Sequence, residues 1–351
     1  MVSNRLLALA VIATFFATCA GSAGGLNSKS SDAGFLMNRH EVLLANGQRM
    51  NLICAGTGKP TVIVESGLGS HMLHWQKVAL RLSTQSRTCF HDRAGFGFSD
   101  ASPKALTTKS VTDDLHSLLR QAGISRPVVL VGHSLGGLYA TVYANRFVKD
   151  VAGLVFIEPS FAQQDKGSSP AQQAQDETAF KASVTKLRSC AVLARAGRLA
   201  NETHEDCFAF ASNRTPAEKD FLSYQFTRPY RYEAMASEIE AQHSPDGVSD
   251  INSKFEIDTR RKFGKMPLVV LTAEMAQNPN DSPADRELAL RSWASWKAGH
   301  DQLASRSTIG TSIVVANTGH FIQIDQPDAV VEAVGKVVAY IRRSSHGSKR
   351  R

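Results

Sequence analysis

Short apolar runs alternate along the chain with longer segments in which apolar residues recur at helical spacing. Runs that are almost uniformly apolar are typical of strands buried on both faces of a parallel sheet. Their alternation with helices predicts an α/β fold, a mostly parallel central sheet with helices on both faces. The expected strands end near residues 65, 91, 133, 157, 273 and 317, and the expected helices cover residues 73–83, 111–123, 135–147, 286–299 and 327–343.

One pair of strands departs from this alternation. Residues 40–56 are predicted to form two strands joined at Asn46-Gly47. That dipeptide is favoured in tight hairpin turns, so an antiparallel hairpin is expected at the start of the fold.

The pattern also lapses once, in a polar, helix-prone and strand-poor interval. We interpret residues 161–264 as a helical cap inserted before the last two strands, between core segments 38–160 and 265–343. Aromatic residues of the cap suggest an apolar pocket, although most are expected to pack the cap itself. They are Phe161, Phe180, Phe208, Phe210, Phe221, Tyr224 and Phe226.

The two ends of the chain have biased compositions. Arg5, the uncharged run 6–18 and the small residues after it predict a signal peptide over residues 1–23, followed by a linker over 24–37. The protein is therefore expected to be exported, with no stable membrane span after cleavage. A lipid anchor at Cys19 and a retained signal anchor are the alternatives.

The formal net charge of +8 is concentrated at these ends. Arg5 and five bases among residues 342–351 account for six of the 40 basic residues, which leaves 34 against 32 acids. The C-terminal bases extend into a basic tail at residues 344–351. No basic patch interleaved with aromatic residues occurs, so a nucleic-acid partner is not expected.

Four cysteines remain when Cys19 is set aside, and four cysteines allow three pairings. Cys190 and Cys207 are the closest pair in sequence, and Cys54 and Cys89 each end an apolar run. We predict the disulfides Cys54–Cys89 and Cys190–Cys207; four free thiols are the alternative. The spacings match no zinc site, and no metal is expected.

Candidate chemistry centres on "VVLVGHSLGGLYA", residues 128–140. The pattern Gly132-x-Ser134-x-Gly136, with a strand before and a helix after, is the nucleophile elbow, which holds a serine on a sharp turn at the sheet edge. The simpler alternative is a glycine-rich turn with an idle serine.

A serine hydroxyl needs a base to take its proton. His320 follows the last apolar strand and so lies at the edge that carries Ser134. His133 is expected to point away from the site. His71, His74 and His91 lie in loops at the same edge and are candidates to line the pocket.

Two backbone amides are candidate donors to an oxyanion. The Leu135 amide begins the helix after the elbow, where the helix dipole favours negative charge. The Leu68 amide lies in the glycine-rich loop "SGLGS" after the strand 61–65. The alternative for that loop is an ordinary tight turn.

Together these motifs resemble the α/β-hydrolase fold superfamily of lipases and esterases over residues 38–343. "GHSLGG", "DRAGFGFSD" and "TGHFIQIDQP" stand where that family has its elbow, its strand-four loop and its histidine loop. The resemblance implies Ser134 as nucleophile, His320 as base, and Leu68 and Leu135 as oxyanion donors. The chain departs from the family at Ser66-Gly67, where His-Gly is usual, and lacks an obvious aspartate after the penultimate strand.

Three carboxylates could complete a triad, and all lie between Ser134 and His320 in the chain. Glu158 ends the strand after the serine's own, where some relatives carry the acid, and its burial would be costly without a partner. Glu274 directly follows the penultimate strand, and Asp281 lies seven residues later. We favour Glu158 and keep Asp281 and Glu274 as alternatives.

The sequence thus predicts a serine hydrolase that cleaves a carboxylic ester or related acyl bond through an acyl-enzyme. The expected partner is a small acyl substrate, apolar in character, and no cofactor is expected. A cofactor-free perhydrolase on the same triad and a slow-turnover binding or receptor protein are the alternatives. Substrate identity and oligomeric state stay open.

Overall fold

The computed structural model describes residues 34–162, 164, 170–199, 207–208, 215–242, 261–275 and 280–348. The predicted signal peptide, Cys19 and Phe210 lie outside the described residues. The last residues of the predicted linker form the short helix η1 (Gly34–Met37), whose Leu36 is fully buried. The described fold therefore includes residues that the composition assigned to the linker.

An eight-stranded sheet forms the centre of the molecule, in the order β1-β2-β4-β3-β5-β6-β7-β8. β4, β3, β5, β6, β7 and β8 pair in parallel, and β1 and β2 are antiparallel to their neighbours. The predicted α/β class and the hairpin around Gly47 are both confirmed. The strands are β1 (Glu41–Leu43), β2 (Arg49–Ala55), β3 (Val62–Glu65), β4 (Thr88–His91), β5 (Val128–His133), β6 (Val151–Ile157), β7 (Leu268–Ala273) and β8 (Thr311–Val315).

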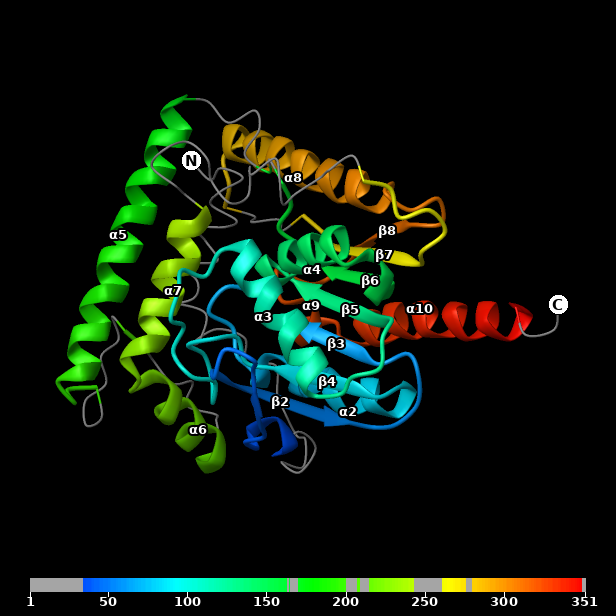
Figure 1. Ribbon diagram of the computed structural model, residues 1–351. Coiled ribbons are helices and arrows are strands. Elements are labelled where there is room, and N and C mark those ends of the chain that lie inside the picture. Colours follow the sequence, from blue (N-terminus) through cyan, green and yellow to red (C-terminus); the bar gives the residue numbers. More distant parts are fainter. Residues whose placement is uncertain are drawn as a thin grey trace.

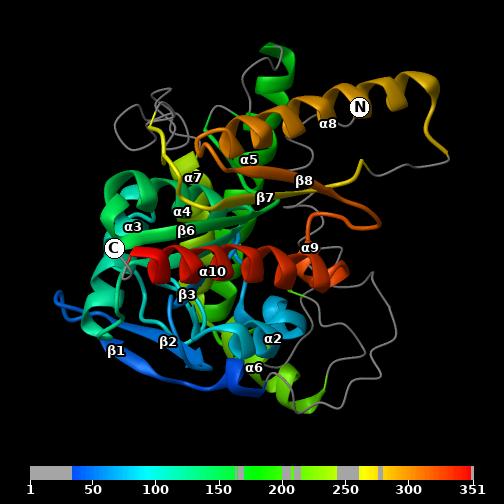
Figure 2. The ribbon, with the colours of Figure 1, turned by 90° about the vertical axis from the view of Figure 1, so that its right-hand side faces the viewer.

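Helices cover both faces of this sheet (Figures 1 and 2). Apolar side chains of α2 (Gln76–Gln85) and α10 (Pro327–Ser348) pack on one face. Those of α3 (Thr108–Gln121), α4 (Leu135–Arg146) and α8 (Pro283–Ala304) pack on the other. Burial on both sides explains why the central strands are apolar at nearly every position. The shorter helices are η2 (Met72–Trp75), η3 (Val148–Asp150) and α9 (Ile322–Asp325).

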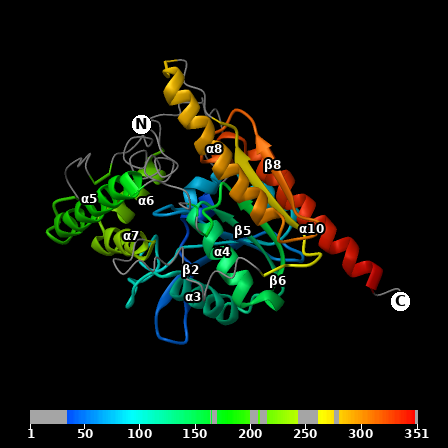
Figure 3. The same cartoon turned by 90° about the horizontal axis from the view of Figure 1, so that it is seen from above.

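The cap lies between β6 and β7 in the chain and consists of α5 (Pro170–Arg195), α6 (Pro216–Phe226) and α7 (Pro229–Gln242). In Figures 1 and 3 these helices form a separate layer beside the sheet. Apolar residues of α5 and α7 share one buried cluster with Leu135 and Leu138 of α4. The predicted insertion before the last two strands is confirmed.

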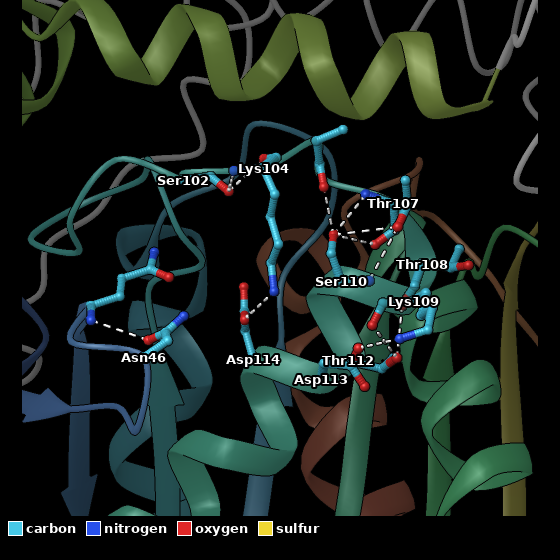
Figure 4. Close-up of polar contacts among 12 residues, drawn as sticks. Asn46, Ser102, Lys104, Thr107, Thr108, Lys109, Ser110, Thr112, Asp113 and Asp114 are labelled. Carbon is cyan, nitrogen blue, oxygen red and sulfur yellow. Dashed lines mark hydrogen bonds and ion pairs between the residues drawn. The ribbon is translucent and has the colours of Figure 1, made fainter.

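The segment that leads into α3 also contacts the cap. Thr107 caps α3 by accepting a hydrogen bond from the Ser110 amide, and the Ser110 hydroxyl accepts one from the Thr107 amide. Figure 4 shows this capping box beside the ion pair of Lys104 with Asp114. The Leu106 amide donates to the Ser237 hydroxyl of α7 at 2.9 Å. A well-defined helix start thus fixes the loop on which α7 rests.

Both disulfides predicted from the sequence are present. Cys54 and Cys89 face one another across the antiparallel pair β2/β4, and Cys190 is bonded to Cys207 within the cap. Disulfides persist in oxidising compartments, which is consistent with export. Among the described helices, none has the length and apolar character needed to cross a membrane.

The C-terminal helix extends further than the sequence indicated. α10 runs to Ser348 and so includes the first five residues of the predicted basic tail. Residues 344 and 345 are exposed, and their hydroxyls donate to the carbonyls one turn earlier, so the helix continues without burying these positions.

The cap disulfide should contribute measurably to stability. The double variant Cys190→Ser/Cys207→Ser should lose about 3 kcal/mol of unfolding free energy, the value expected for closing a loop of this length. Urea denaturation measures the difference, which should vanish when both proteins are reduced. An equal stability of the oxidised proteins would contradict the prediction.

Candidate active site

Ser134 lies on a sharp turn between β5 and α4. Its backbone has φ 53° and ψ −125°, a conformation that is strained for a residue with a side chain. The turn brings neighbouring backbone segments very close: a Cβ atom on Gly136 would lie 2.3 Å from the Glu65 carbonyl oxygen. A Cβ atom on Gly132 would lie 2.5 Å from the Gly136 oxygen. Only glycine fits at these two positions, as an elbow requires.

The glycine-rich loop after β3 packs directly on this elbow. A Cβ atom on Gly67 would lie 3.1 Å from the Ser134 Cβ. The Leu68 amide has no hydrogen-bond acceptor among the described residues. The Leu135 amide is the first of α4 and so has no carbonyl one helical turn before it. The Leu135 amide follows Ser134 directly in the chain, and the Leu68 amide lies in the loop that packs on the elbow.

His320 lies between β8 and α9, and its side chain is mostly buried. Its Nδ1 atom is 3.4 Å from Oε2 of Glu158. The carboxylate can only accept, so Nδ1 carries the proton and Nε2 is left with a lone pair. Nε2 is buried and has no hydrogen-bond partner in the described part of the chain. In a neutral imidazole whose Nδ1 donates to Glu158, Nε2 is the atom that can accept a hydrogen bond.

The expectation that His133 points away from the site is wrong. Its ring centroid lies 4.8 Å from that of His320, and its Nε2 donates to the His320 carbonyl at 2.9 Å. Burial lowers the pKa of His133 well below its usual range, and the neighbouring His320 adds to this effect. Neutral His133 thus holds the histidine loop against the elbow.

Glu158 follows β6, the strand next to β5, and is 1% exposed. Its φ of 47° turns the backbone sharply. Oε1 accepts a hydrogen bond from the Ala273 amide at 2.6 Å, and Oε2 accepts one from Nε1 of Trp296 at 3.1 Å. The carboxylate is thus buried with a partner on each oxygen, as a buried charge requires.

The two alternative carboxylates are placed differently. Glu274 is exposed at the end of β7, where its amide donates to the Val315 carbonyl. Asp281 is half-buried just before α8, and its carbonyl accepts from Arg286. Of the three candidates, Glu158 is the one whose contact with His320 the structure records.

Sequence reasoning missed two residues that hold the Glu158 turn. Trp296 and His300 lie one turn apart on α8. His300 is fully buried; its Nε2 donates to the Pro159 carbonyl at 2.9 Å, and its Nδ1 accepts from the Thr272 hydroxyl. The role of a Trp-x-x-x-His pair on a polar helix could not be predicted from the sequence, because it depends on which distant residues the helix covers.

His91 does not line a pocket as a free side chain. It is buried, and its Nε2 donates to Glu65 at 3.0 Å in a cluster that also contains Arg93 and Glu238 of the cap. Burial opposes the ionisation of Glu65, yet His91 and Arg93 lower its pKa overall. For Glu238, burial raises the pKa more than the neighbouring Arg93 lowers it, so the pKa is raised overall.

Aromatic residues from the loops and the cap surround this edge of the sheet. His71 and His74 pack together at 4.1 Å between ring centroids, and Phe221 lies 6.5 Å from His71. Phe161 packs instead on Trp296 and His300 beside the Glu158 turn. Phe180, Phe208 and Phe226 pack within the cap cluster, as expected of most of these aromatics. The described residues contain no cluster of His, Cys, Asp or Glu side chains suited to a metal ion.

A family model described as "Alpha/beta hydrolase family" matches residues 62–333. The chain therefore belongs to the α/β hydrolase family. An uncharacterised protein from Schizosaccharomyces pombe is 40% identical over 87 residues, which are 25% of this chain and 16% of that protein. The chain spans less than half the length of the curated relatives it matches.

Solved structures show the same fold at low sequence identity. An esterase from Thermogutta terrifontis matches with a TM-score of 0.57 at 19% identity, over 87% of this chain and 99% of the esterase. The enol-lactonase from Burkholderia xenovorans matches with a TM-score of 0.56 at 19% identity, over 86% of this chain and all of the lactonase. At this identity the likeness establishes the fold alone.

The neutral state of His300 predicts a pH dependence of stability. Burial lowers the pKa of His300 below its ordinary value of 6.5, with His320 and Lys297 contributing and Glu158 opposing. Unfolding therefore takes up a proton below pH 6.5, so stability present above that pH is lost as the pH falls.

We expect His300→Gln to flatten this loss, because glutamine can keep both hydrogen bonds but does not titrate. Between pH 8 and pH 5 the unfolding free energy of the wild type should fall more steeply, by up to about 1.4 kcal/mol per pH unit for this one group. Urea denaturation at several pH values measures it. Parallel curves would count against a neutral buried His300.

Proposed function

We propose that the protein is a serine hydrolase that cleaves a carboxylic ester or related acyl bond, with Ser134, His320 and Glu158 as its triad. The observation that carries the proposal is the pairing of Glu158 with Nδ1 of His320, with Nε2 left unpaired beside a strained serine elbow. Nucleophile, base and orienting carboxylate are the parts this chemistry needs. Esterase and lactonase neighbours agree with acyl chemistry.

In this mechanism Ser134 Oγ attacks the acyl carbon while its proton passes to Nε2 of His320. The tetrahedral intermediate then collapses, and the leaving alcohol takes that proton from His320. The acyl group stays on Ser134 as an ester. Water attacks the ester with His320 again as base, and the carboxylic acid leaves as the serine regains its proton.

Glu158 acts in this mechanism by holding the imidazole in one tautomer and by stabilising its charged form. The 3.4 Å contact is long for a charged hydrogen bond, but such contacts commonly tighten when substrate binds. Trp296 and the Ala273 amide keep the carboxylate oriented meanwhile. The amides of Leu68 and Leu135 donate to the oxyanion, where such donors act most strongly.

We also propose that this hydrolase works outside the reducing cytoplasm. Two disulfides support that location, because they would not persist among cytosolic thiols. The substrate is proposed to be a small molecule, admitted between the cap and the sheet edge.

Ser134→Ala should abolish ester hydrolysis while leaving the fold intact. We expect kcat on p-nitrophenyl acetate to fall by about 10⁶, the scale for loss of a triad nucleophile. The thermal midpoint should change little, because alanine keeps the elbow backbone. A fluorophosphonate probe should label the wild type at Ser134. A wild-type protein that folds but takes up no label would favour the binding-protein alternative.

Substitution of the three carboxylates should single out Glu158. Glu158→Gln should lower kcat by about 10²–10⁴, since a neutral amide fixes the wrong tautomer of the histidine. The matched variants Glu274→Gln and Asp281→Asn should keep kcat within a few fold. A hundredfold loss in Asp281→Asn together with an active Glu158→Gln would overturn the assignment of the acid.

A further inference from the structure

The buried Arg93 binds two carbonyl oxygens of the loop that carries the Leu68 amide. Arg93, from the loop after β4, donates through one terminal nitrogen to the Ser66 carbonyl at 2.6 Å and through the other to the Gly67 carbonyl at 2.8 Å. It also donates to Glu65, the last residue of β3, at 2.8 Å. The side chain of Arg93 is 4% exposed.

The Gly67 contact has a direct consequence for the Leu68 amide. The Gly67 carbonyl and the Leu68 N–H belong to the same peptide unit, which is planar and trans. In such a unit the N–H points opposite to the C=O. A guanidinium that fixes the Gly67 oxygen on one side therefore aims the Leu68 N–H to the other, free of any described acceptor.

The cap holds the same arginine and the same loop from the other side. Nε of Arg93 donates to Oε1 of Glu238 on α7 at 2.7 Å, and Oε2 of Glu238 is 3.4 Å from the Gly69 amide. Arg231 of α7 donates to the Gly69 carbonyl at 2.8 Å. The loop is thus fixed between the sheet edge and the cap by charged hydrogen bonds, which are the strong ones.

Such a cluster is costly as a device for stability alone. Arg93, Glu65 and Glu238 are all withdrawn from water, and apolar residues of similar volume often stabilise a core as well or better. What apolar side chains cannot do is hold carbonyl oxygens in a set direction. Four of the five N–H groups of Arg93 donate to four different acceptors, a match that the three N–H groups of lysine cannot reproduce.

We propose that Arg93 is a positioning residue that aims the Leu68 amide into the oxyanion site, and that Glu238 of the cap holds Arg93 in place. This inference rests on the proposed function of Ser134 and Leu68. It adds that the cap takes part in catalysis as well as in enclosing the substrate, because the alignment of an oxyanion donor depends on α7.

Arg93→Lys tests this proposal. Loss of one oxyanion donor costs about 10²–10³ in kcat. We expect misalignment of Leu68 to lower kcat at least about tenfold, with little change in KM. The specific readout is a trifluoromethyl ketone, which forms a charged tetrahedral adduct on the serine, compared with the methyl ketone of the same chain. Affinity for the trifluoromethyl ketone should fall by the same factor as kcat/KM, and affinity for the methyl ketone should not.

The matched control is Arg306→Lys, the same substitution at an arginine that is equally buried. Arg306 donates to Asn145 of α4, and no contact is recorded between it and the loop that carries Leu68. It should leave kcat and both ketone affinities unchanged. If Arg93→Lys does not fold, Glu238→Gln tests the same contacts. It replaces the carboxylate that orients the Arg93 guanidinium by a neutral amide, which is a weaker acceptor. It should reduce trifluoromethyl ketone affinity in parallel with kcat/KM.

The outcomes separate the two proposals. Equal loss of affinity for both ketones, or wild-type kcat and trifluoromethyl ketone affinity in the folded variant, would overturn the role of Arg93 while Ser134 chemistry stands. Failure of wild-type Ser134 to react with a fluorophosphonate would overturn the proposed function and this inference with it.

Discussion

The left-handed turn at Ser134 is the constraint on which the structure at the carboxyl ends of the parallel strands depends. Ser134 is held at φ 53° where β5 meets α4. Its amide donates to the Ile157 carbonyl of β6, and its carbonyl accepts from the Ser160 amide. Strain of this kind persists only where surrounding structure over-determines it. Those two hydrogen bonds also join the serine turn to the Glu158 turn, so the two sites cannot move independently.

The position of Glu158, which we propose as the acid of the triad, determines which side chains must cover it. Glu158 turns with φ 47° at the end of an apolar strand, and α8 closes over it with Trp296 and His300. A carboxylate at a loop position further along the chain, such as Asp281, would meet more water and need less support. The position of the buried Glu158 carboxylate at the end of β6 thus explains why a largely polar, exposed helix carries two buried aromatic side chains one turn apart.

Much of the fold could be predicted because local patterns determine it. The apolar strands, the Asn46-Gly47 turn and the elbow glycines are each recognisable within a dozen residues, and the polar insertion is recognisable from its composition. The disulfide Cys54–Cys89 was predicted from where two apolar runs end, and Cys190–Cys207 from the closeness of the two cysteines in sequence. The orientation of His133 could not be predicted, since it depends on the histidine loop almost 190 residues away. The roles of Trp296, His300 and Arg93 could not be predicted for the same reason, because their partners come from distant segments of the chain.

The buried charges around Arg93 give the cap a second physical role. A cap packed by apolar contacts alone could shift over the sheet edge at little cost, because such contacts have no preferred direction. Glu238 and Arg231 instead bind specific backbone atoms of the loop at Gly69 and, through Arg93, at Gly67. Any motion of α7 over the sheet edge must therefore carry this loop with it or break buried charged hydrogen bonds. Under the proposed function, the same contacts would therefore couple access of substrate beneath the cap to the alignment of the Leu68 amide.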